Sequence, residues 1–322
     1  MSHILTTDVL DPGQVDAVLA LAEAARAADG VDALSEQTLL RVRHGAPLGT
    51  TRFHLLHEEA DGGPLLGGFA FAAVTPDEPD AAELVVAPSL RRRGLGRLLL
   101  DDLLANASAR GLRLWAHGRL DGARALAASA GLEQVRGLLK MRLPLRAVGG
   151  SPPPGLSEPR LSPEVAESLE IRAFRVGADE REWLRANARA FADHPEQGGM
   201  TLADLRQRQE EEWFDPDGFF VAADLRSGRI AGYHWTKTHA DGAGLTDGEP
   251  VGEVYVVGVD PAWQGSGLGR ALTLTGLRHL RDRGLPWVLL YVDEENRTAV
   301  RLYESLGFGL WAADVMYARP EK

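Results

Sequence analysis

EVYVVGVDPAWQGSGLGRALTLTGLRHL, residues 253–280, has the pattern of a strand, a tight turn and a helix. Its first seven residues are rich in valine, whose β-branched side chain suits a packed strand. Asp260-Pro261 ends that strand because proline has no N–H to donate to a neighbouring strand. From Leu268 onward the apolar residues recur at helical spacing. We therefore predict that a glycine-rich turn joins the strand to the helix.

The turn itself, QGSGLGR at residues 264–270, has the composition of an anion site. Glycine lets the backbone approach a bulky anion closely, and the first N–H groups of a helix have no partner inside the helix. Such N–H groups bind phosphate with help from the helix dipole, and Arg270 can add a charge-assisted bond. We predict that the turn holds a diphosphate, with a plain tight turn as the alternative. It matches neither the Walker A motif nor GxGxxG.

A second copy of this pattern lies at residues 83–99, ELVVAPSLRRRGLGRLL. The Gly-Leu-Gly-Arg of residues 94–97 matches that of residues 267–270, about 173 residues later. Gly131-Leu132 and Gly307-Phe308 end the matching segments. A repeat of this length indicates two domains rather than a solenoid. We expect domains at residues 1–143 and 161–322, joined by a Pro/Gly-rich linker at residues 144–160.

The chain outside these segments supports the same division. The first element that we predict is a helix beginning at Asp11-Pro12. Runs of apolar and β-branched residues predict a last strand near residues 135–143 and another near residues 310–318. Each of these strands is expected to complete its own half of the chain.

These motifs resemble those of the GCN5-related N-acetyltransferases, over nearly the whole chain. The acyl-CoA signature of that family, Q/R-x-x-G-x-G/A at the start of a helix, matches residues 264–269 and 91–96. A second signature is matched by Asn296, Ala299, Tyr303, Glu304, Gly307 and Phe308. The resemblance implies an α/β fold with two tandem domains, each a mixed, mostly antiparallel twisted sheet flanked by helices.

The tandem layout, together with the segments HPEQGG, WFDP, YHW and GEVYVVGVDP, resembles one branch of that family. Members of this branch acetylate the cysteinyl amine of cysteinyl-glucosaminyl-inositol with acetyl-CoA. The resemblance implies acetyl-CoA as acyl donor and no metal. It implies donor contacts at Leu84, Val85, Val86, Arg92, Arg93, Gly94, Leu95, Gly96, Arg97, Val257, Gly258, Val259, Gln264, Gly265, Ser266, Gly267, Leu268, Gly269, Arg270, Asn296, Arg297, Thr298, Ala299, Val300 and Arg301. It implies acceptor contacts at Glu36, Glu196, Lys237, Glu253 and Tyr291.

Glu253 and Tyr303 are the predicted catalytic residues. Strand alternation places Glu253, Tyr255, Val257 and Val259 on one face, with Glu253 near the reacting end. Glu253 is expected to accept a proton from the substrate ammonium, because only a neutral amine attacks a thioester. Tyr303 is expected to protonate the leaving thiolate. The alternatives are a solvent-facing carboxylate and a core tyrosine.

The first half lacks the residues that this chemistry requires. Ala127 occupies the position of Tyr303, and Leu120 occupies that of Asn296. Asp80 aligns with Glu253. We therefore expect the first half to bind acetyl-CoA without transferring the acetyl group.

The composition restricts the remaining classes of function. The 322-residue chain has a net charge of −11, which argues against nucleic acid as a partner. No secretory signal and no apolar run of about 18–20 residues is present, so we expect a cytoplasmic protein without a membrane partner. Cysteine is absent, which excludes disulfides and an acyl-cysteine intermediate and favours direct attack by the amine. We expect a monomer.

Two other functions remain open on the sequence. The same fold acetylates other amines, such as an aminoglycoside, an amine metabolite or a protein N-terminus. A non-enzymatic acyl-CoA sensor would bind the donor without transferring its acyl group. An acetylation assay with the cysteinyl acceptor distinguishes the three.

Overall fold

The computed structural model describes residues 2–60, 63–147, 152–153, 155–192, 195–240, 242 and 248–320. The chain forms two compact units, and each takes a segment from the other half of the sequence. The first unit consists of residues 1–139, 293–295 and 312–322, and the second of residues 140–292 and 296–311. These ranges differ from the expected 1–143 and 161–322, because the end of the chain returns to the first unit.

In the first unit the strands follow the order β1-β2-β3-β4-β5-β12. The strands are β1 (His3–Thr7), β2 (Thr51–Ala60), β3 (Gly63–Ala73), β4 (Asp80–Val86), β5 (Leu112–His117) and β12 (Gly309–Ala318). The helices are α1 (Pro12–Asp29), α2 (Glu36–His44), α3 (Leu95–Asn106) and α4 (Asp121–Ser129). The β4–β5 pair is parallel, whereas β1–β2, β2–β3, β3–β4 and β5–β12 are antiparallel. Strand β1 was not predicted, because it is short, largely exposed and without a clear alternation.

In the second unit the order is β6-β11-β10-β9-β8-β7, and the part of β6 that belongs to this unit begins at Lys140. The strands are β6 (Glu133–Pro144), β7 (Leu169–Ala173), β8 (Phe219–Asp224), β9 (Ile230–His239), β10 (Val251–Val259) and β11 (Trp287–Asp293). The helices are α5 (Pro163–Ala166), α6 (Glu180–Ala190), α7 (Pro195–Gly198), α8 (Leu202–Gln209), α9 (Leu268–Asp282) and α10 (Arg297–Ser305). The β10–β11 pair is parallel and the pairs among β7 to β10 are antiparallel, which confirms the predicted mixed, mostly antiparallel sheet.

The last strand of each half does not lie where it was expected. We predicted that a strand near residues 135–143 completes the first half, but β6 lies beside β11 and β12 lies beside β5. Side-chain contacts accompany the exchange. The Arg142 guanidinium lies 4.9 Å from the Trp287 ring of β11, and Asp314 of β12 contacts His117 of β5 at 3.0 Å. A repeat in the sequence does not reveal which copy a terminal strand joins.

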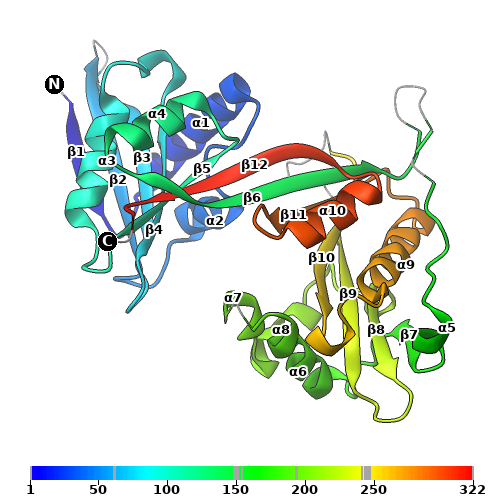
Figure 1. The fold of residues 1–322 in the computed structure, drawn as a ribbon. Helices are drawn as coiled ribbons and strands as arrows, with labels where there is room; N and C mark the ends of the chain where they lie inside the picture. Colours follow the sequence, from blue (N-terminus) through cyan, green and yellow to red (C-terminus); the bar gives the residue numbers. More distant parts are fainter. Residues whose placement is uncertain are drawn as a thin grey trace. The chain divides into compact units, whose positions relative to one another are not determined.

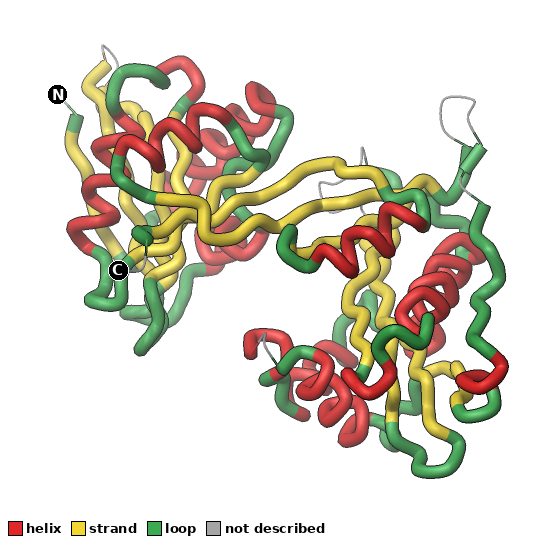
Figure 2. Tube along the Cα trace, in the orientation of Figure 1, coloured by secondary structure: helices red, strands yellow, loops and turns green. Residues whose placement is uncertain are grey.

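Helices cover both faces of each sheet, as Figures 1 and 2 show. In the second unit, Trp183 of α6 and Leu205 of α8 pack on one face with Phe219 and Trp235. On the opposite face, Leu268 and Leu272 of α9 pack against Ala222 and Ala231. The first unit has the same layers, since α1 and α2 contribute to one apolar core and α3 and α4 to another. Along each strand of these sheets, successive side chains therefore point alternately toward one helix layer and the other.

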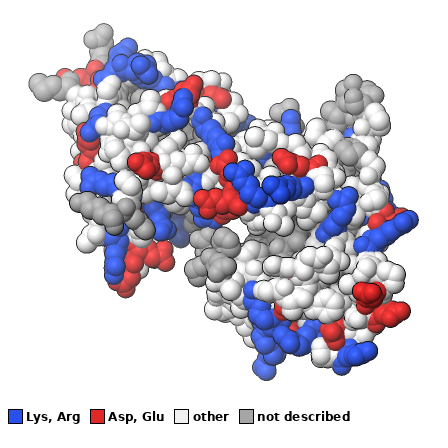
Figure 3. Space-filling view, viewed as in Figure 1, with Lys and Arg blue, Asp and Glu red and all other residues white. Residues whose placement is uncertain are grey.

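Within the described ranges, none of the helices is both long and apolar enough to cross a membrane. Acidic and basic side chains lie interspersed on the face drawn in Figure 3. Part of the expected linker, residues 148–151 and 154, lies outside the described residues.

Candidate active site

Strand β10 contains a β-bulge that changes which side chains share a face. Its pairing with β9 shifts between Val254 and Val256, so Tyr255 is an extra residue. Tyr255 and Val256 consequently both pack on the α6 and α8 side, while Val259 packs on the α9 side. A bulge adds one residue and reverses the alternation beyond it.

The prediction that Glu253, Tyr255, Val257 and Val259 share one face is therefore wrong. Gly252 faces Leu280 of α9, since an added Cβ at Gly252 would lie 2.9 Å from that side chain. Its neighbour Glu253 accordingly faces the α6 and α8 side with Tyr255. Alternation within β10 gave the wrong face because the bulge is defined by pairing with β9 and cannot be recognised in a valine-rich sequence.

Beyond the bulge, β10 separates from β11. The recorded parallel pairing runs from Val251 to Val254, whereas the pairing with β9 continues to Val259. Residues 255–259 therefore present one backbone edge with no recorded strand partner among the described residues. Strand β4 separates from β5 in the same way. The β4–β5 pairing ends at Glu83 and does not include Leu84, Val85 and Val86. Such an edge can add an extended ligand as if it were another strand.

The turn after β10 has the features of an anion site. Gly265 and Gly267 have φ angles of +78° and +84°, and Gly267 directly precedes the 15-residue helix α9. The N–H groups of Gly265, Gly267 and Gly269 have no recorded acceptor among the described residues. An added Cβ at Gly265 or Gly267 would meet nothing within 4 Å, so the space over the turn is open. Free amides at the start of a helix fit a diphosphate.

The residues of this turn differ in what they offer a ligand. Gln264 and Arg270 are exposed, whereas the Leu268 side chain is fully buried in the core. The Ser266 hydroxyl donates to the Trp263 carbonyl at 2.6 Å and accepts from the N–H of Leu268 at 3.4 Å. Leu268 is thus a packing residue, and backbone groups and the exposed side chains are what a ligand would contact.

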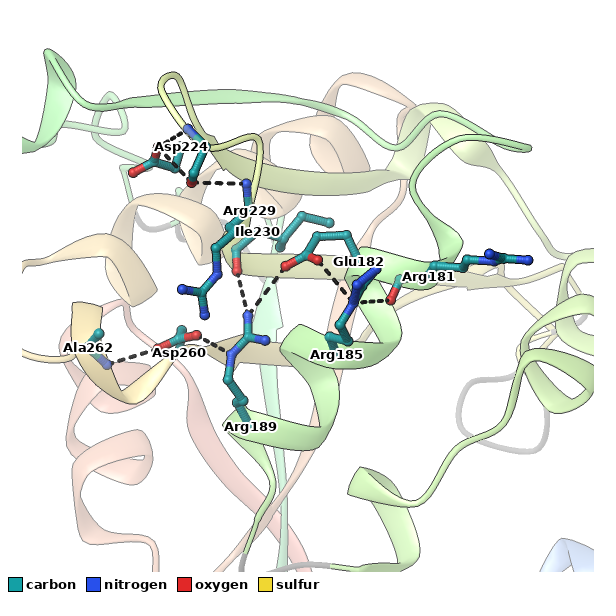
Figure 4. A network of polar contacts seen from close by, with 10 residues as sticks. Arg181, Glu182, Arg185, Arg189, Asp224, Arg229, Ile230, Asp260 and Ala262 are labelled. Atoms are coloured by element: carbon teal, nitrogen blue, oxygen red, sulfur yellow. Dashed lines mark hydrogen bonds and ion pairs between the residues drawn. The ribbon is translucent and has the colours of Figure 1, made fainter.

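An ion pair anchors the start of the turn. Arg189 of α6 donates to Asp260 at 2.5 Å and also contacts Glu182 at 3.5 Å, as Figure 4 shows. The second oxygen of Asp260 accepts the N–H of Ala262 at 3.0 Å. Burial by itself raises the pKa of Asp260, but the Ala262 N–H and the Arg189 guanidinium outweigh it and lower this pKa. The carboxylate therefore stays ionised and holds the turn against α6.

The first unit repeats this turn with three different residues, Arg91, Arg92 and Arg93. Gly94 has a φ angle of +86°, and Arg92 has a φ angle of +63° where the second unit has Gly265. Arg91 is engaged in a bidentate ion pair with Asp29, at 2.6 and 2.8 Å. Arg92 and Arg93 are exposed. The basic character of this turn therefore comes from Arg92 and Arg93, while Arg91 has a structural role.

One side-chain contact is the same in both units. Arg97 donates to the carbonyl of Ser129 at 2.7 Å, and Arg270 donates to the hydroxyl of Ser305 at 2.7 Å. Each arginine belongs to the helix after the turn, and each serine ends the next helix. Leu95 is buried in the core, and an added Cβ at Gly96 would lie 3.3 Å from Leu126. The repeat therefore extends to individual contacts.

Glu253 lies on β10 with its side chain only 11% exposed. Its Oε2 lies 2.6 Å from Nε2 of His239, at the end of β9. Lys237 is its cross-strand partner, and the Lys237 ammonium lies 4.8 Å from the Trp213 ring and 5.7 Å from the Tyr255 ring. The structure thus groups a carboxylate, an imidazole and an ammonium on one face of the sheet. His239 was not predicted, because sequence spacing does not show which residues of β9 and β10 are neighbours.

Tyr303 lies in α10 and is 8% exposed. Its ring packs edge-on against Phe308, with the ring centroids 5.7 Å apart. Burial raises the pKa of Tyr303 to about 12. The phenol therefore stays protonated at neutral pH and can act as a hydrogen-bond donor or acid.

The residues before and within α10 occupy accessible positions at its start. The Asn296 side chain caps α10 by accepting the N–H of Ala299 at 3.1 Å. Among the other predicted donor contacts of α10, three are exposed and two are half-buried. The exposed residues are Arg297, Thr298 and Arg301, and the half-buried residues are Ala299 and Val300. Val257 and Val259 are half-buried on β10, and Gly258 is buried. These groups are all in the second unit.

The first-unit residues that align with Glu253, Tyr303 and Asn296 have different surroundings. Asp80 aligns with Glu253 but is fully buried, and it accepts the N–H of Ser108 at 2.9 Å. The pairing of β3 with β4 runs without the shift that forms the bulge in β10. Ala127 is a buried core residue and Leu120 precedes α4 without a capping side chain. The first unit does contain a buried carboxylate-imidazole pair, Glu83 and His117, but at positions that do not align with Glu253 and His239.

Two of the predicted acceptor contacts are exposed or half-buried side chains of the second unit. Tyr291 on β11 is 40% exposed, and the Lys140 ammonium lies 5.8 Å from its ring. Lys237 is half-buried. Glu36 begins α2 and Glu196 belongs to α7, but the side chains of both lie outside the described part of the structure.

Comparison with protein families matches residues 18–131 and 169–308 to the acetyltransferase (GNAT) family. The two matches confirm the predicted repeat, and they end before β6 and β12, the two exchanged strands.

Two relatives match the chain over its whole length. A mycothiol acetyltransferase from Thermobifida fusca (strain YX) is 72% identical over 323 residues, covering 100% of both chains. A mycothiol acetyltransferase from Nocardiopsis dassonvillei is 62% identical over 326 residues, covering 99% of this chain and 97% of the relative.

Two solved structures share the fold. A GCN5-related N-acetyltransferase from Sphaerobacter thermophilus has a TM-score of 0.69 at 25% identity, covering 99% of this chain and 97% of the other. A tandem GNAT protein from the clavulanic acid biosynthesis pathway has a TM-score of 0.69 at 16% identity, covering 100% of both chains.

Proposed function

Because the chain belongs to the acetyltransferase (GNAT) family, we propose that it is a mycothiol acetyltransferase. The reaction transfers the acetyl group of acetyl-CoA to the cysteinyl amine of 1D-myo-inositol 2-(L-cysteinylamino)-2-deoxy-α-D-glucopyranoside and yields mycothiol. The observation that carries this choice of acceptor is the 72% identity to the Thermobifida fusca protein across the whole chain.

Donor binding follows from the backbone of the second unit. The free amides of Gly265, Gly267 and Gly269 hold the diphosphate of acetyl-CoA, and Arg270 lies beside them. The unpaired edge of residues 255–259 hydrogen-bonds the pantetheine amides as an added strand would. The start of α10, from Asn296 to Arg301, contributes further contacts. The acetyl thioester then reaches the end of the gap where β10 and β11 separate.

The chemistry is a direct attack of the amine on the thioester. Glu253 accepts a proton from the acceptor ammonium, and the neutral amine forms a bond to the thioester carbon. The C–S bond breaks, the nitrogen releases its second proton to solvent as the amide forms, and the CoA thiolate takes a proton from the Tyr303 phenol, which is then reprotonated from solvent. Burial, which raises the pKa of Tyr303 to about 12, keeps this proton available at neutral pH.

For the acceptor we retain the side chains that the resemblance implied. A sugar and an inositol ring present many hydroxyl groups, which carboxylate, ammonium and phenol side chains bind. The acceptor ligands proposed are Glu36, Glu196, Lys237, Glu253 and Tyr291. Lys237 and Glu253 are cross-strand partners, which supports a shared acceptor site for these two.

The first unit is proposed to bind acetyl-CoA without catalysing transfer. Its turn has similar positive φ angles, and β4 beyond Glu83 likewise has no strand partner on that edge among the described residues, which supports binding; one group there, the Val86 carbonyl, accepts from Arg91 at 3.1 Å. The fully buried Asp80 and the core residue Ala127 provide neither a base nor an acid, which supports the absence of transfer. Gly96→Asp is expected to abolish donor binding to this unit only, halving the stoichiometry seen by calorimetry.

The test is an acetylation assay on the purified chain. With acetyl-CoA and cysteinyl-glucosaminyl-inositol, we expect free CoA thiol and a product heavier by one acetyl group. Turnover of an aminoglycoside amine in place of this acceptor would overturn the choice of substrate. Saturable acetyl-CoA binding without transfer to either acceptor would identify a sensor. Sedimentation in the same buffer tests the proposed monomer.

A further inference from the structure

The imidazole of His239 contacts the carboxylate that the proposed function uses as its base. His239 is paired with Val251 in the antiparallel register, and Lys237 is paired with Glu253. His239 and Lys237 are two residues apart and therefore lie on the same face of β9. His239 is thus the diagonal neighbour of Glu253, and its Nε2 lies 2.6 Å from Oε2 of that carboxylate.

The hydrogen bond between His239 and Glu253 is largely shielded from water. The side chains of His239 and Glu253 are 12% and 11% exposed, so water competes little for the contact. The described residues provide no second hydrogen bond to this carboxylate. A carboxylate held by one oxygen keeps the other oxygen available in a defined direction.

We propose that His239 is a positioning residue for acetyl transfer, and the proposal rests on the role given to Glu253 in the proposed function. The Nε2–H of His239 donates to Oε2 and leaves Oε1 to accept the proton of the acceptor ammonium. No bond to His239 forms or breaks in this step. The proton moves from the ammonium nitrogen to Oε1, and the nitrogen lone pair becomes free to attack.

Charged and polar side chains lie around this contact. They include Lys237 of β9, Tyr255 of β10 and Arg208 of α8. The Arg208 guanidinium is engaged with the Tyr255 hydroxyl at 3.1 Å, and Lys237 lies over the Trp213 ring.

Two substitutions test the role of the donor. The Gln side chain in His239→Gln retains an N–H donor, whereas the Leu side chain in His239→Leu has none. We expect His239→Leu to lower kcat by about 10- to 100-fold with an unchanged KM for acetyl-CoA. We expect His239→Gln to stay within about threefold of the wild-type kcat.

The matched control is His54 of the first unit, whose Nδ1 lies 2.5 Å from the Asp102 carboxylate. His54→Leu removes this similarly short contact outside the site and is expected to keep the wild-type kcat. Melting temperature and the heat of acetyl-CoA binding are measured for every variant. If His239→Leu does not fold, the kcat of His239→Ala, which also lacks an N–H donor, decides the question.

Glu253→Gln distinguishes failure of this inference from failure of the proposed function. If Glu253→Gln turns over at the wild-type rate, the role of Glu253 is wrong and the inference falls with it. If Glu253→Gln is inactive but the His239 variants without an N–H donor keep the wild-type kcat, the positioning role of His239 alone is overturned. A kcat that is lowered in His239→Leu and largely restored in His239→Gln, with His54→Leu unchanged, supports it.

Discussion

Replacing Gly258 with alanine tests how tightly β10 is packed beside the site. An added Cβ at Gly258 would lie 2.6 Å from both Cζ and the hydroxyl oxygen of Tyr233. Tyr233 is fully buried, its hydroxyl donates to Asn187 at 2.6 Å, and its ring packs edge-on against Trp183 at 5.2 Å. Because these contacts fix the ring on several sides, it cannot move aside without losing one of them.

The expected cost follows from these contacts. Overpacking a well-filled core costs about 1–3 kcal/mol, and losing a buried hydrogen bond adds about 1 kcal/mol. For a unit of this size, 1 kcal/mol lowers the melting temperature by about 2–4 °C. We therefore expect Gly258→Ala to lower the unfolding transition of the second unit by about 4–16 °C, measured by circular dichroism without acetyl-CoA.

Gly269→Ala is the matched control in the same segment. Its added Cβ would lie 3.5 Å from Val259, an ordinary contact, and Gly269 already has a helical position in α9. Since alanine is the better helix former by about 1 kcal/mol, stability is expected to stay the same or rise. A Gly258→Ala protein that unfolds at the wild-type temperature would refute the view that Tyr233 is held rigidly.

Three further predictions concern the proposed acid Tyr303, the glycine-rich turn of the first unit at Arg92, and the buried ion pairs of His117. Tyr303→Phe is expected to lower kcat about 10- to 100-fold with little change in the KM for acetyl-CoA, and an unchanged kcat in steady-state assays would remove Tyr303 from the mechanism. Arg92 has a φ angle of +63°, which is strained for a residue with a side chain, so Arg92→Gly is expected to stabilise the first unit by about 1 kcal/mol. The melting temperature should rise, and a lower melting temperature would contradict the argument from strain. Burial alone would lower the pKa of His117, but Asp314 and Glu83 raise it to about 9. Because this folded-state pKa lies above the unfolded value near 6.5, the stabilisation is complete below pH 6.5 and is lost as pH rises through about 9. Denaturant titrations should show a loss on the order of 3 kcal/mol over that range in wild type and a flatter response in His117→Gln.

Several features of the site were predictable because they depend on neighbours in the chain. Pro261 ends a strand wherever it occurs, and the glycines at 265 and 267 permit the positive φ angles of the turn. The free amides at the start of α9 follow from helix geometry alone. The anion site could therefore be inferred from about a dozen consecutive residues.

Other features depend on residues that are distant in the sequence. The bulge at Tyr255 is defined by the pairing of β10 with β9, and it moves Val257 and Val259 to the face opposite Glu253. The contact between His239 and Glu253 depends on the same register. Because a shift of one residue moves a side chain to the other face, alternation within one strand cannot locate either feature.

The sequence by itself determined the repeated α/β unit, the two glycine-rich turns and the loss of Tyr303 and Glu253 equivalents in the first copy. These are properties of local hydrogen-bonding capacity and residue chemistry. Only the tertiary structure decided that β6 joins β11, that β12 joins β5, and which side chains surround Glu253. Strand order and register are set by contacts such as those of Arg142 with Trp287 and of Asp314 with His117, which form between segments that the chain order does not bring together.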